Sequence, residues 1–242
     1  MKNAHSVTRD FEAALCEYTG APYAVAVNSC TMALLLAVRW CLKGPTIWFE
    51  GGHSALVTSS QPVVQCVSIP KRTYVSVPMS IIHAGGKPVF RDEEWLGLYQ
   101  LAPLPVFDCA RWFTSGMYRG NHVMEGDAIP CAGVDKVKLV TPLAGSMLCV
   151  SFHVSKTLGD TQGGAILHDN PEADRWFRKA RLDGRTEGVD PKYDKEIIVG
   201  WHGYINPDTA LRLLWRMATL PEHNAPLPND DYSDLSTLEC FK

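Results

Sequence analysis

One lysine stands where the local pattern favours chemistry as well as surface charge. Lys156 follows the apolar run 148–152 and precedes the double glycine of Gly163 and Gly164, where the backbone can approach another group closely. Most lysines are solvated surface charges, and that interpretation stays open for Lys156. A lysine withdrawn from water at the end of a buried strand loses basicity, however, and can act as the nucleophile that forms a Schiff base.

A carboxylate and an aromatic side chain occupy comparable positions. Asp108 comes directly after the apolar strand predicted at residues 105–107, where a carboxylate either caps a helix or pairs with a buried cation. The protonated ring nitrogen of a bound cofactor is one such cation, and keeping it protonated makes the ring an electron sink. Tyr74 is either a core residue or an aromatic face that packs on such a ring.

Hydroxyl groups and backbone N–H groups gather at a strand-to-helix turn. The apolar strand 23–27 runs into the polar residues 28–31 and then into the apolar helix 32–41. The first turn of a helix leaves its N–H groups free, so this turn can bind an anion such as phosphate. The candidate donors are Ser29, Cys30, Thr31 and, at the end of another predicted strand, Ser151. Such residues are more often simple helix caps, so the pattern gains weight only through its place beside Lys156.

Short strands and helices alternate along the chain. Strands are expected at residues 23–27, 46–49, 63–67, 88–90, 105–107, 148–152 and 164–167, and helices before Gly20 and at 32–41, 75–84, 170–182 and 207–217. This alternation predicts an α/β fold with three layers, in which helices cover both faces of a mainly parallel central sheet. Because ligands bind at the carboxyl ends of strands in such sheets, the polar residues that follow the strands are expected to converge there.

The composition is that of an ordinary globular protein. The 242 residues are 46% hydrophobic and 20% charged, which suffices for one sizeable core. A formal charge of −3 argues against a dedicated nucleic-acid surface, and no apolar run suits a membrane span or a signal peptide, so we expect a cytoplasmic protein. The eight cysteines contain no C-x-x-C pair and are expected to be buried, reduced thiols, with no metal site and no disulfide.

Two segments stand apart from the alternating pattern. Residues 119–147 show no clear periodicity and are expected to form an elaborated loop, inserted in a compact domain that spans residues 1–220. Residues 221–242 contain three prolines and many polar side chains and are expected to form a coil tail on the surface. The sequence therefore predicts one compact domain with one insertion, followed by a tail.

Six blocks of the sequence carry a resemblance to a known family. They are FEAALCEYTGAPYAVAVNSCTMALLLAV (11–38), IPKRTYVSVPMSIIHAGGKPVFRD (69–92), FDCARWF (107–113), SFHVSKTLGDTQGGAILHD (151–169), RLDGR (181–185) and GWHGYINPDTALRLL (200–214). In this order they resemble the DegT/DnrJ/EryC1/StrS sugar aminotransferases, which are pyridoxal 5'-phosphate (PLP) enzymes of fold type I. The blocks extend over nearly the whole chain, so the resemblance is specific although each block is short.

The resemblance implies a role for each candidate residue. Lys156 would carry PLP as a Schiff base and transfer protons, Asp108 would hold the ring nitrogen, and Tyr74 would stack on the ring. The residues implied to bind the cofactor's phosphate are Ser29, Cys30, Thr31, Ser151 and, from the other subunit of a homodimer, His202. The lysine at position 156 disfavours the dehydratase relatives, which carry histidine in its place.

Some positions depart from the family's pattern. Cys30 replaces a usual glycine, His202 replaces an asparagine, and Arg111 replaces the His or Gln that contacts the cofactor's phenolic oxygen. Arg111 could reach that oxygen or a substrate carboxylate. The stretch 92–108 is shorter than usual, the segment 119–147 is extra and the usual C-terminal small domain is expected to be missing. The chain is therefore similar to compact forms of the family that occur in some viral and surface-glycan gene sets.

The leading hypothesis is a homodimeric, PLP-dependent aminotransferase with shared active sites. It would move an amino group from a donor such as glutamate to a keto group on a sugar nucleotide or a similar large substrate. One alternative is a PLP-dependent decarboxylase or lyase that acts on an amino-acid-like group of a modified nucleotide or base, as in viral-type DNA modification. A second alternative is a relative that binds a ligand without catalysis, against which the presence of both Lys156 and Asp108 weighs.

Overall fold

The computed structural model describes residues 5–43, 46–48, 54–56, 64–118, 145–229 and 231–242. Its helices are α1 (Ser6–Thr19), α2 (Cys30–Leu42), α3 (Ser76–His83), α4 (Pro171–Ala180) and α5 (Pro207–Met217), with 3-10 helices η1 (Leu235–Thr237) and η2 (Glu239–Phe241). Its strands are β1 (Tyr23–Val27), β2 (Thr46–Trp48), β3 (Ser54–Leu56), β4 (Cys66–Pro70), β5 (Lys87–Arg91), β6 (Tyr99–Gln100), β7 (Val106–Asp108), β8 (Met147–Ser151) and β9 (Gly164–His168). None of these described helices is both long and apolar enough to cross a membrane.

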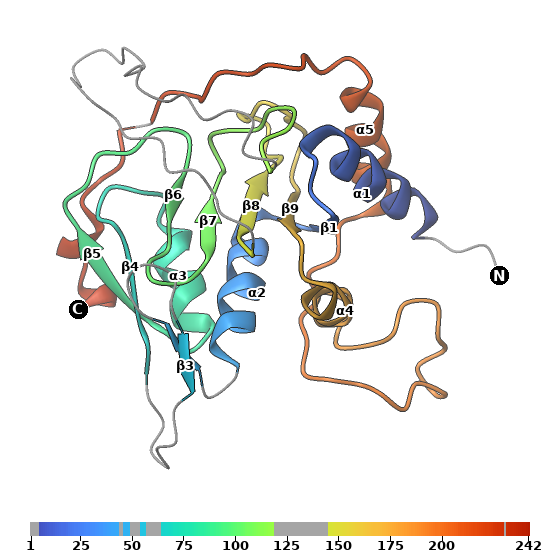
Figure 1. Cartoon of the computed structure of the whole chain (residues 1–242), viewed down its shortest axis with the longest axis horizontal. Coiled ribbons are helices and arrows are strands. Elements are labelled where there is room, and N and C mark those ends of the chain that lie inside the picture. Colours follow the sequence, from blue (N-terminus) through green and yellow to red (C-terminus); the bar gives the residue numbers. More distant parts are fainter. Residues whose placement is uncertain (1–4, 44–45, 49–53, 57–63, 119–144, 230) are drawn as a thin grey trace.

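The central sheet has the strand order β1-β9-β8-β7-β6 (Figure 1). Only β7 and β8 pair in parallel, whereas the other three pairs of this sheet are antiparallel. The α/β class is thus confirmed, but the sheet is mixed and the expected mainly parallel pairing is wrong. The reason is the length of two connections: residues 152–163 and 101–105 turn back without a helix, so each returns its strand in the opposite direction.

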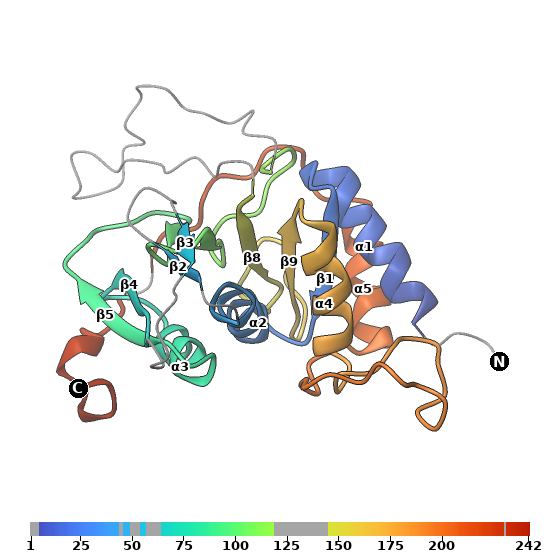
Figure 2. The same ribbon diagram turned by 60° about the horizontal axis from the view of Figure 1, so that its bottom comes forward.

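Helices cover both faces of the sheet, as the sequence predicts. Figure 2 shows α2 on one side of β8 and β9, and α1 with α5 on the other. Alternation along β1 explains the arrangement: Val25 and Val27 join the core beneath α2, whereas Ala24 and Ala26 join the core beneath α1 and α5. The three-layer architecture is therefore confirmed by two apolar cores, one on each face.

Local signals set several helix ends. Gly20 ends α1 with a left-handed φ of 77°, which costs glycine little. The side chain of Asn170 accepts from the first backbone N–H groups of α4, and that of Asn206 does so for α5. In both helices proline occupies the first turn, where its missing N–H costs no helical hydrogen bond.

The predicted insertion lies mostly outside the described residues, whereas the predicted tail is described almost completely. Of the predicted insertion 119–147, residues 119–144 lie outside the described residues, and β8 already begins at Met147. The tail 221–242 leaves α5, crosses the top of the view in Figure 1 and ends beside β5. It binds the domain through backbone bonds, because Leu227 N–H donates to Arg111 O (2.7 Å) and Leu235 N–H donates to Lys71 O (2.9 Å).

The cysteines of the described part of the chain form no disulfide bond. Cys109 and Cys149 are buried, as expected, but Cys66 and Cys240 are exposed. The expectation of buried thiols is therefore wrong for those two. Within the same residues, no group of three or more His, Cys, Asp or Glu side chains could hold a metal ion.

Candidate active site

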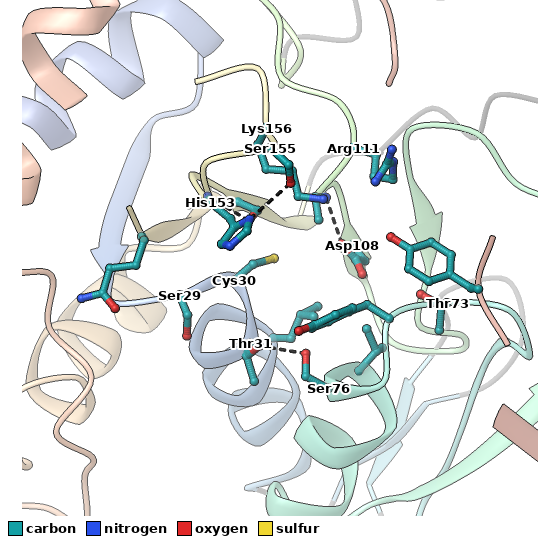
Figure 3. Close-up of a pocket in the computed structure, with 18 of the residues that line it drawn as sticks. Ser29, Cys30, Thr31, Thr73, Ser76, Asp108, Arg111, His153, Ser155 and Lys156 are labelled. Atoms are coloured by element: carbon teal, nitrogen blue, oxygen red, sulfur yellow. Dashed lines mark hydrogen bonds between the residues drawn. The ribbon is translucent and has the colours of Figure 1, made fainter. Parts of the chain in front are cut away.

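A cavity of about 390 Å³ lies where β7, β8 and the starts of α2 and α3 come together (Figure 3). This volume is within the range of small-molecule sites, roughly 300–1,000 Å³. Eight of the nine predicted site residues line it: Ser29, Cys30, Thr31, Tyr74, Asp108, Arg111, Ser151 and Lys156. The parallel pairing of β7 with β8 brings their carboxyl ends to one edge, which is why residues 43 positions apart, Asp108 and Ser151, share the cavity.

Asp108 lines the cavity and is 5% exposed. The Tyr99 hydroxyl donates to its Oδ2 (2.7 Å), and the backbone N–H of Ala110 donates to its Oδ1 (2.9 Å). Burial raises the pKa of Asp108, and the opposing effects of these two donors and of the Lys156 ammonium do not cancel that rise. The site therefore holds a carboxylate whose charge its surroundings compensate only in part.

Lys156 lies in the tight turn between β8 and β9. Its backbone N–H donates to His153 O (2.8 Å), and Figure 3 shows its side chain extending toward Asp108. A Cβ on Gly159 would lie 2.6 Å from Val154 O, so only glycine fits the turn at that position. The turn thus presents Lys156 to the cavity from a closely packed backbone.

The close backbone approach expected at the double glycine is present, and its partner is the start of α2. A Cβ on Gly164 would lie 2.5 Å from the backbone nitrogen of Cys30, which real side chains do not tolerate. Gly163 pairs with Ser29 through an isolated bridge. The double glycine therefore fixes the first turn of α2 against β9, beside Lys156.

Two helix starts face the same part of the cavity. The Thr31 and Ser76 hydroxyls, from the first turns of α2 and α3, are 2.8 Å apart (Figure 3). Ser29 caps α2, since its Oγ accepts from Met32 N–H (3.1 Å). Converging helix starts offer N–H donors and positive dipole ends to an anion. Ser76 is absent from the predicted set, although the predicted helix 75–84 would have pointed to it.

Tyr74 and Arg111 both line the cavity but differ in their exposure to solvent. Tyr74 is 59% exposed, so the alternative that it is a core residue is wrong. Arg111 is buried, and its guanidinium donates to Pro228 O while its own carbonyl accepts from Leu227 N–H. The tail thus fixes the position of Arg111.

His202 does not reach the cavity of its own chain. Its side chain is 71% exposed, its Nδ1 lies 3.1 Å from the Asp183 carboxylate, and its ring packs edge-on against Tyr204. The expected contact of His202 with the cofactor's phosphate would be made in a second subunit, so that contact stays a prediction.

The tail supplies a wall that the sequence analysis missed. Tyr232 lines the cavity and stacks on Trp95, with ring centroids 6.2 Å apart and an interplanar angle of 16°. Trp95 in turn packs edge-on against Tyr99 (4.7 Å). No local signal marks Tyr232, because the contact joins residues 137 positions apart.

Comparison with known proteins finds relatives in one family of aminotransferases. Residues 3–96 match the sequence model of the DegT/DnrJ/EryC1/StrS aminotransferase family. The spore coat polysaccharide biosynthesis protein SpsC of Bacillus subtilis is 28% identical over 204 residues, which cover 76% of this chain and 48% of SpsC. The chain thus spans about half the length of this curated relative.

Solved structures extend the likeness in fold to most of the chain. A DegT/DnrJ/EryC1/StrS aminotransferase from Brucella abortus has a TM-score of 0.58 at 18% identity, over 89% of this chain and 59% of its own. DesV of S. venezuelae gives 0.57 at 22% identity, over 88% and 57%. PseC of Helicobacter pylori gives 0.58 at 18% identity, over 89% and 58%. The protein therefore has the fold of the DegT/DnrJ/EryC1/StrS aminotransferases, and its residues 3–96 carry that family's sequence pattern.

Proposed function

We propose that this cavity binds PLP and that the protein is a PLP-dependent aminotransferase. The observation that carries the proposal is that Lys156 and the buried Asp108 face one cavity, whose other end is formed by two helix starts. A nucleophilic amine, a carboxylate for a ring nitrogen and an anion site are the three features that PLP requires.

The residues fit the cofactor chemically. Asp108 accepts from Tyr99 and from Ala110 N–H, and burial keeps its pKa raised despite the Lys156 ammonium, so a cationic ring nitrogen would find a buried carboxylate to pair with. The groups at the helix starts that would hold the phosphate are Ser29, Cys30, Thr31 and Ser76, with Ser151 beside them. Tyr74 would cover one face of the ring. Arg111, three residues after Asp108 in the sequence, also lines the cavity.

Bound PLP supplies an electron sink for the electrons of a broken bond at the amino-bearing carbon. The chain's own residues do the rest. Lys156 would hold the cofactor through its amine, and the same amine would take up and return a proton at the amino-bearing carbon. Asp108 would hold a positive charge on the ring side of the cavity, where its side chain is almost fully withdrawn from solvent.

The substrates are proposed from relatives and from the shape of the site. SpsC is described as a spore coat polysaccharide biosynthesis protein, and PseC as an aminotransferase involved in the biosynthesis of pseudoaminic acid. A keto group on a sugar nucleotide or similar large molecule is therefore the proposed acceptor, with glutamate as the amino donor. Tyr74 lines the cavity and is largely exposed, which is consistent with a large acceptor that extends into solvent.

We place His202 in the active site of a second copy of the chain, in a homodimer. Its side chain is mostly exposed and lies outside its own cavity, so a partner could approach it. The exposed thiols of Cys66 and Cys240 suit a reducing compartment, which supports a cytoplasmic location.

The test is reduction of the PLP-loaded protein with borohydride, followed by peptide mapping. The pyridoxyl group is expected on Lys156, and Lys156→Ala should retain none. The unreduced protein should then be mixed with L-glutamate, where conversion to the pyridoxamine form supports transamination. Carbon dioxide release without that conversion would instead support the decarboxylase alternative, and label on another lysine, or on none, would overturn the proposal.

A further inference from the structure

A buried tyrosine contacts Asp108 from the neighbouring strand. Tyr99 lies opposite Asp108 in the antiparallel register of β6 and β7, so their side chains emerge on the same face. Tyr99 is 1% exposed, and its hydroxyl donates to Asp108 Oδ2 over 2.7 Å. With Ala110 N–H on the other oxygen, both oxygens of the carboxylate have a fixed donor.

The direction of the next hydrogen bond follows from proton counting. Thr73 Oγ1 lies 2.6 Å from the Tyr99 oxygen. A tyrosine hydroxyl has one proton, and here that proton points to Asp108, so Thr73 must be the donor. The result is a directed chain from Thr73 through Tyr99 to Asp108.

Packing shields the hydrogen bonds of Thr73, Tyr99 and Asp108 from solvent and holds the Tyr99 ring in one orientation. Trp95 packs edge-on against Tyr99, and Trp95 Nε1–H donates to Arg72 O (2.9 Å), which fixes the indole. Burial and the neighbouring Asp108 raise the pKa of Tyr99 well above its ordinary value, so the hydroxyl keeps the proton that it donates. Low local polarity strengthens such hydrogen bonds and makes their loss costly.

This series of hydrogen bonds also joins the two sides of the proposed cofactor site. Thr73 directly precedes Tyr74, the residue proposed to cover the ring, whereas Asp108 is proposed to hold the ring nitrogen. A displacement of Tyr99 would therefore change the orientation of the carboxylate and the position of residues 73–74 together.

We propose that Tyr99 is a positioning residue, which fixes the Asp108 carboxylate toward the ring nitrogen and holds it in its ionised form, with Thr73 as the donor that orients Tyr99. This inference rests on the proposed PLP function. It adds to that function a residue that itself lines no part of the cavity.

The test compares two tyrosines that each lose their hydroxyl group. Tyr99→Phe removes the donor to Asp108, whereas the control Tyr118→Phe removes a hydroxyl that donates to Ser146 O (3.0 Å) outside the cavity. Affinity for PLP is measured against pH by spectroscopic titration of the cofactor-free protein. We expect Tyr99→Phe to weaken PLP binding about ten-fold, as loss of one hydrogen bond to a charged group implies, and Tyr118→Phe to leave it unchanged.

The pH profile separates positioning from mere packing. The Tyr99 hydrogen bond lowers the pKa of Asp108, so its loss should move the acidic limb of PLP binding to higher pH. Thr73→Val should produce a smaller shift in the same direction, and Thr73→Ser, which keeps the hydroxyl, should restore the wild-type profile. These threonine variants test the inference even if Tyr99→Phe folds poorly.

The outcomes distinguish this inference from the function on which it rests. If Tyr99→Phe and Thr73→Val keep the wild-type affinity and pH profile, Tyr99 is only a packing residue, while the proposed function stands. If the wild-type protein itself binds no PLP, the proposed function is overturned and the inference falls with it.

Discussion

Glu12 and Asp108 are both buried carboxylates, and they differ in the cations that surround them. Glu12, in α1, is 3% exposed and lies between two guanidiniums, those of Arg178 (2.6 Å) and Arg181, while Ala26 N–H donates to it as well (3.0 Å). Burial alone would raise the pKa of Glu12, but the two arginines outweigh it and the pKa lies below its ordinary value.

Asp108 has a different environment at similar burial. Its donors include a tyrosine hydroxyl and a backbone N–H, and the Lys156 ammonium lowers its pKa less than burial raises it. Glu12 therefore ties α1 to α4 and β1 within the fold, whereas Asp108 is the carboxylate that we propose pairs with a cation of the cofactor. The two carboxylates are similarly buried, so the difference between them lies in the two arginines that surround Glu12.

The largest effect should come from breaking the Glu12 cluster. Glu12→Gln removes the carboxylate that Arg178 and the buried Arg181 share. Asp174 still pairs with Arg178 (2.7 Å) and Glu187 lies 3.6 Å from Arg181, so we expect a loss of about 3 kcal/mol of unfolding free energy. Urea unfolding measures this loss, with Glu17→Gln on the exposed side of the same helix as the control. PLP affinity should stay unchanged, and a variant as stable as the wild-type protein would contradict the assignment of Glu12 as a structural charge.

The reverse pattern is expected at Asp108. Asp108→Asn keeps the shape of the side chain but removes the charge proposed for the ring nitrogen, so the conversion of bound PLP by L-glutamate should slow about 10²–10³-fold. The melting temperature should change little, because the variant removes a buried charge that is only partly compensated. A stability loss like that of Glu12→Gln, with unchanged conversion, would show that the two carboxylates are alike.

A buried histidine beside the Glu12 cluster extends the comparison to pH. His168 is fully buried between Tyr23 and Phe177, and burial lowers its pKa to about 4. Because its unfolded pKa is near 6.5, the unfolded state binds the proton first as pH falls, and stability is lost below about pH 6.5. The loss between pH 7.5 and pH 5 should be about 2 kcal/mol.

Variants at two histidines measure that loss. His168→Phe should flatten the fall in unfolding free energy between pH 7.5 and pH 5, whereas His223→Phe, at an exposed position, should leave it as in the wild-type protein. Glu12 does not interfere in this window, since its lowered pKa places its own loss of stability below pH 4.5. An unchanged slope for His168→Phe would assign the acid sensitivity to other groups.

Neighbouring residues along the chain account for what the sequence predicted well. Strand 23–27 is predicted with the bounds of β1, because an apolar run ends in a polar turn. Asn170 with Pro171, and Pro207 for the last helix, fix helix starts within one turn. Eight of the nine candidate residues come to one cavity, because they follow the ends of strands or lie at the starts of helices.

Contacts between distant residues account for what the sequence did not predict. The direction of β9 depends on how residues 152–163 turn, and an apolar strand pattern is the same in either direction. The sequence does not distinguish Tyr99 from other aromatic residues, because its role depends on the pairing of β6 with β7. Tyr232 belongs to a predicted coil, and only the contact of the tail with Trp95 brings it to the cavity. Hydrophobic periodicity carries no information on such pairings.

The smallest effect separates one helix-capping residue at the site from one elsewhere. Ser29 caps α2 and lines the cavity, whereas Asn170 caps α4 away from it. Replacing either by alanine removes a side-chain acceptor for the first turn and should cost about 1 kcal/mol of unfolding free energy. Only Ser29→Ala should also weaken PLP binding, because only the Ser29 hydroxyl is one of the groups proposed to hold the phosphate.

Both variants are compared by urea unfolding and by spectroscopic titration with PLP. Equal loss of stability with a several-fold loss of PLP affinity confined to Ser29→Ala would show that one motif serves the fold at α4 and the ligand at α2. Equal PLP affinity in both variants would mean that Ser29 does no more than Asn170, and the phosphate would then have to be held through Thr31 and Ser76, whose hydroxyls face the same end of the cavity. Thr31→Val and Ser76→Ala test that assignment directly, since neither residue is the capping residue of its helix.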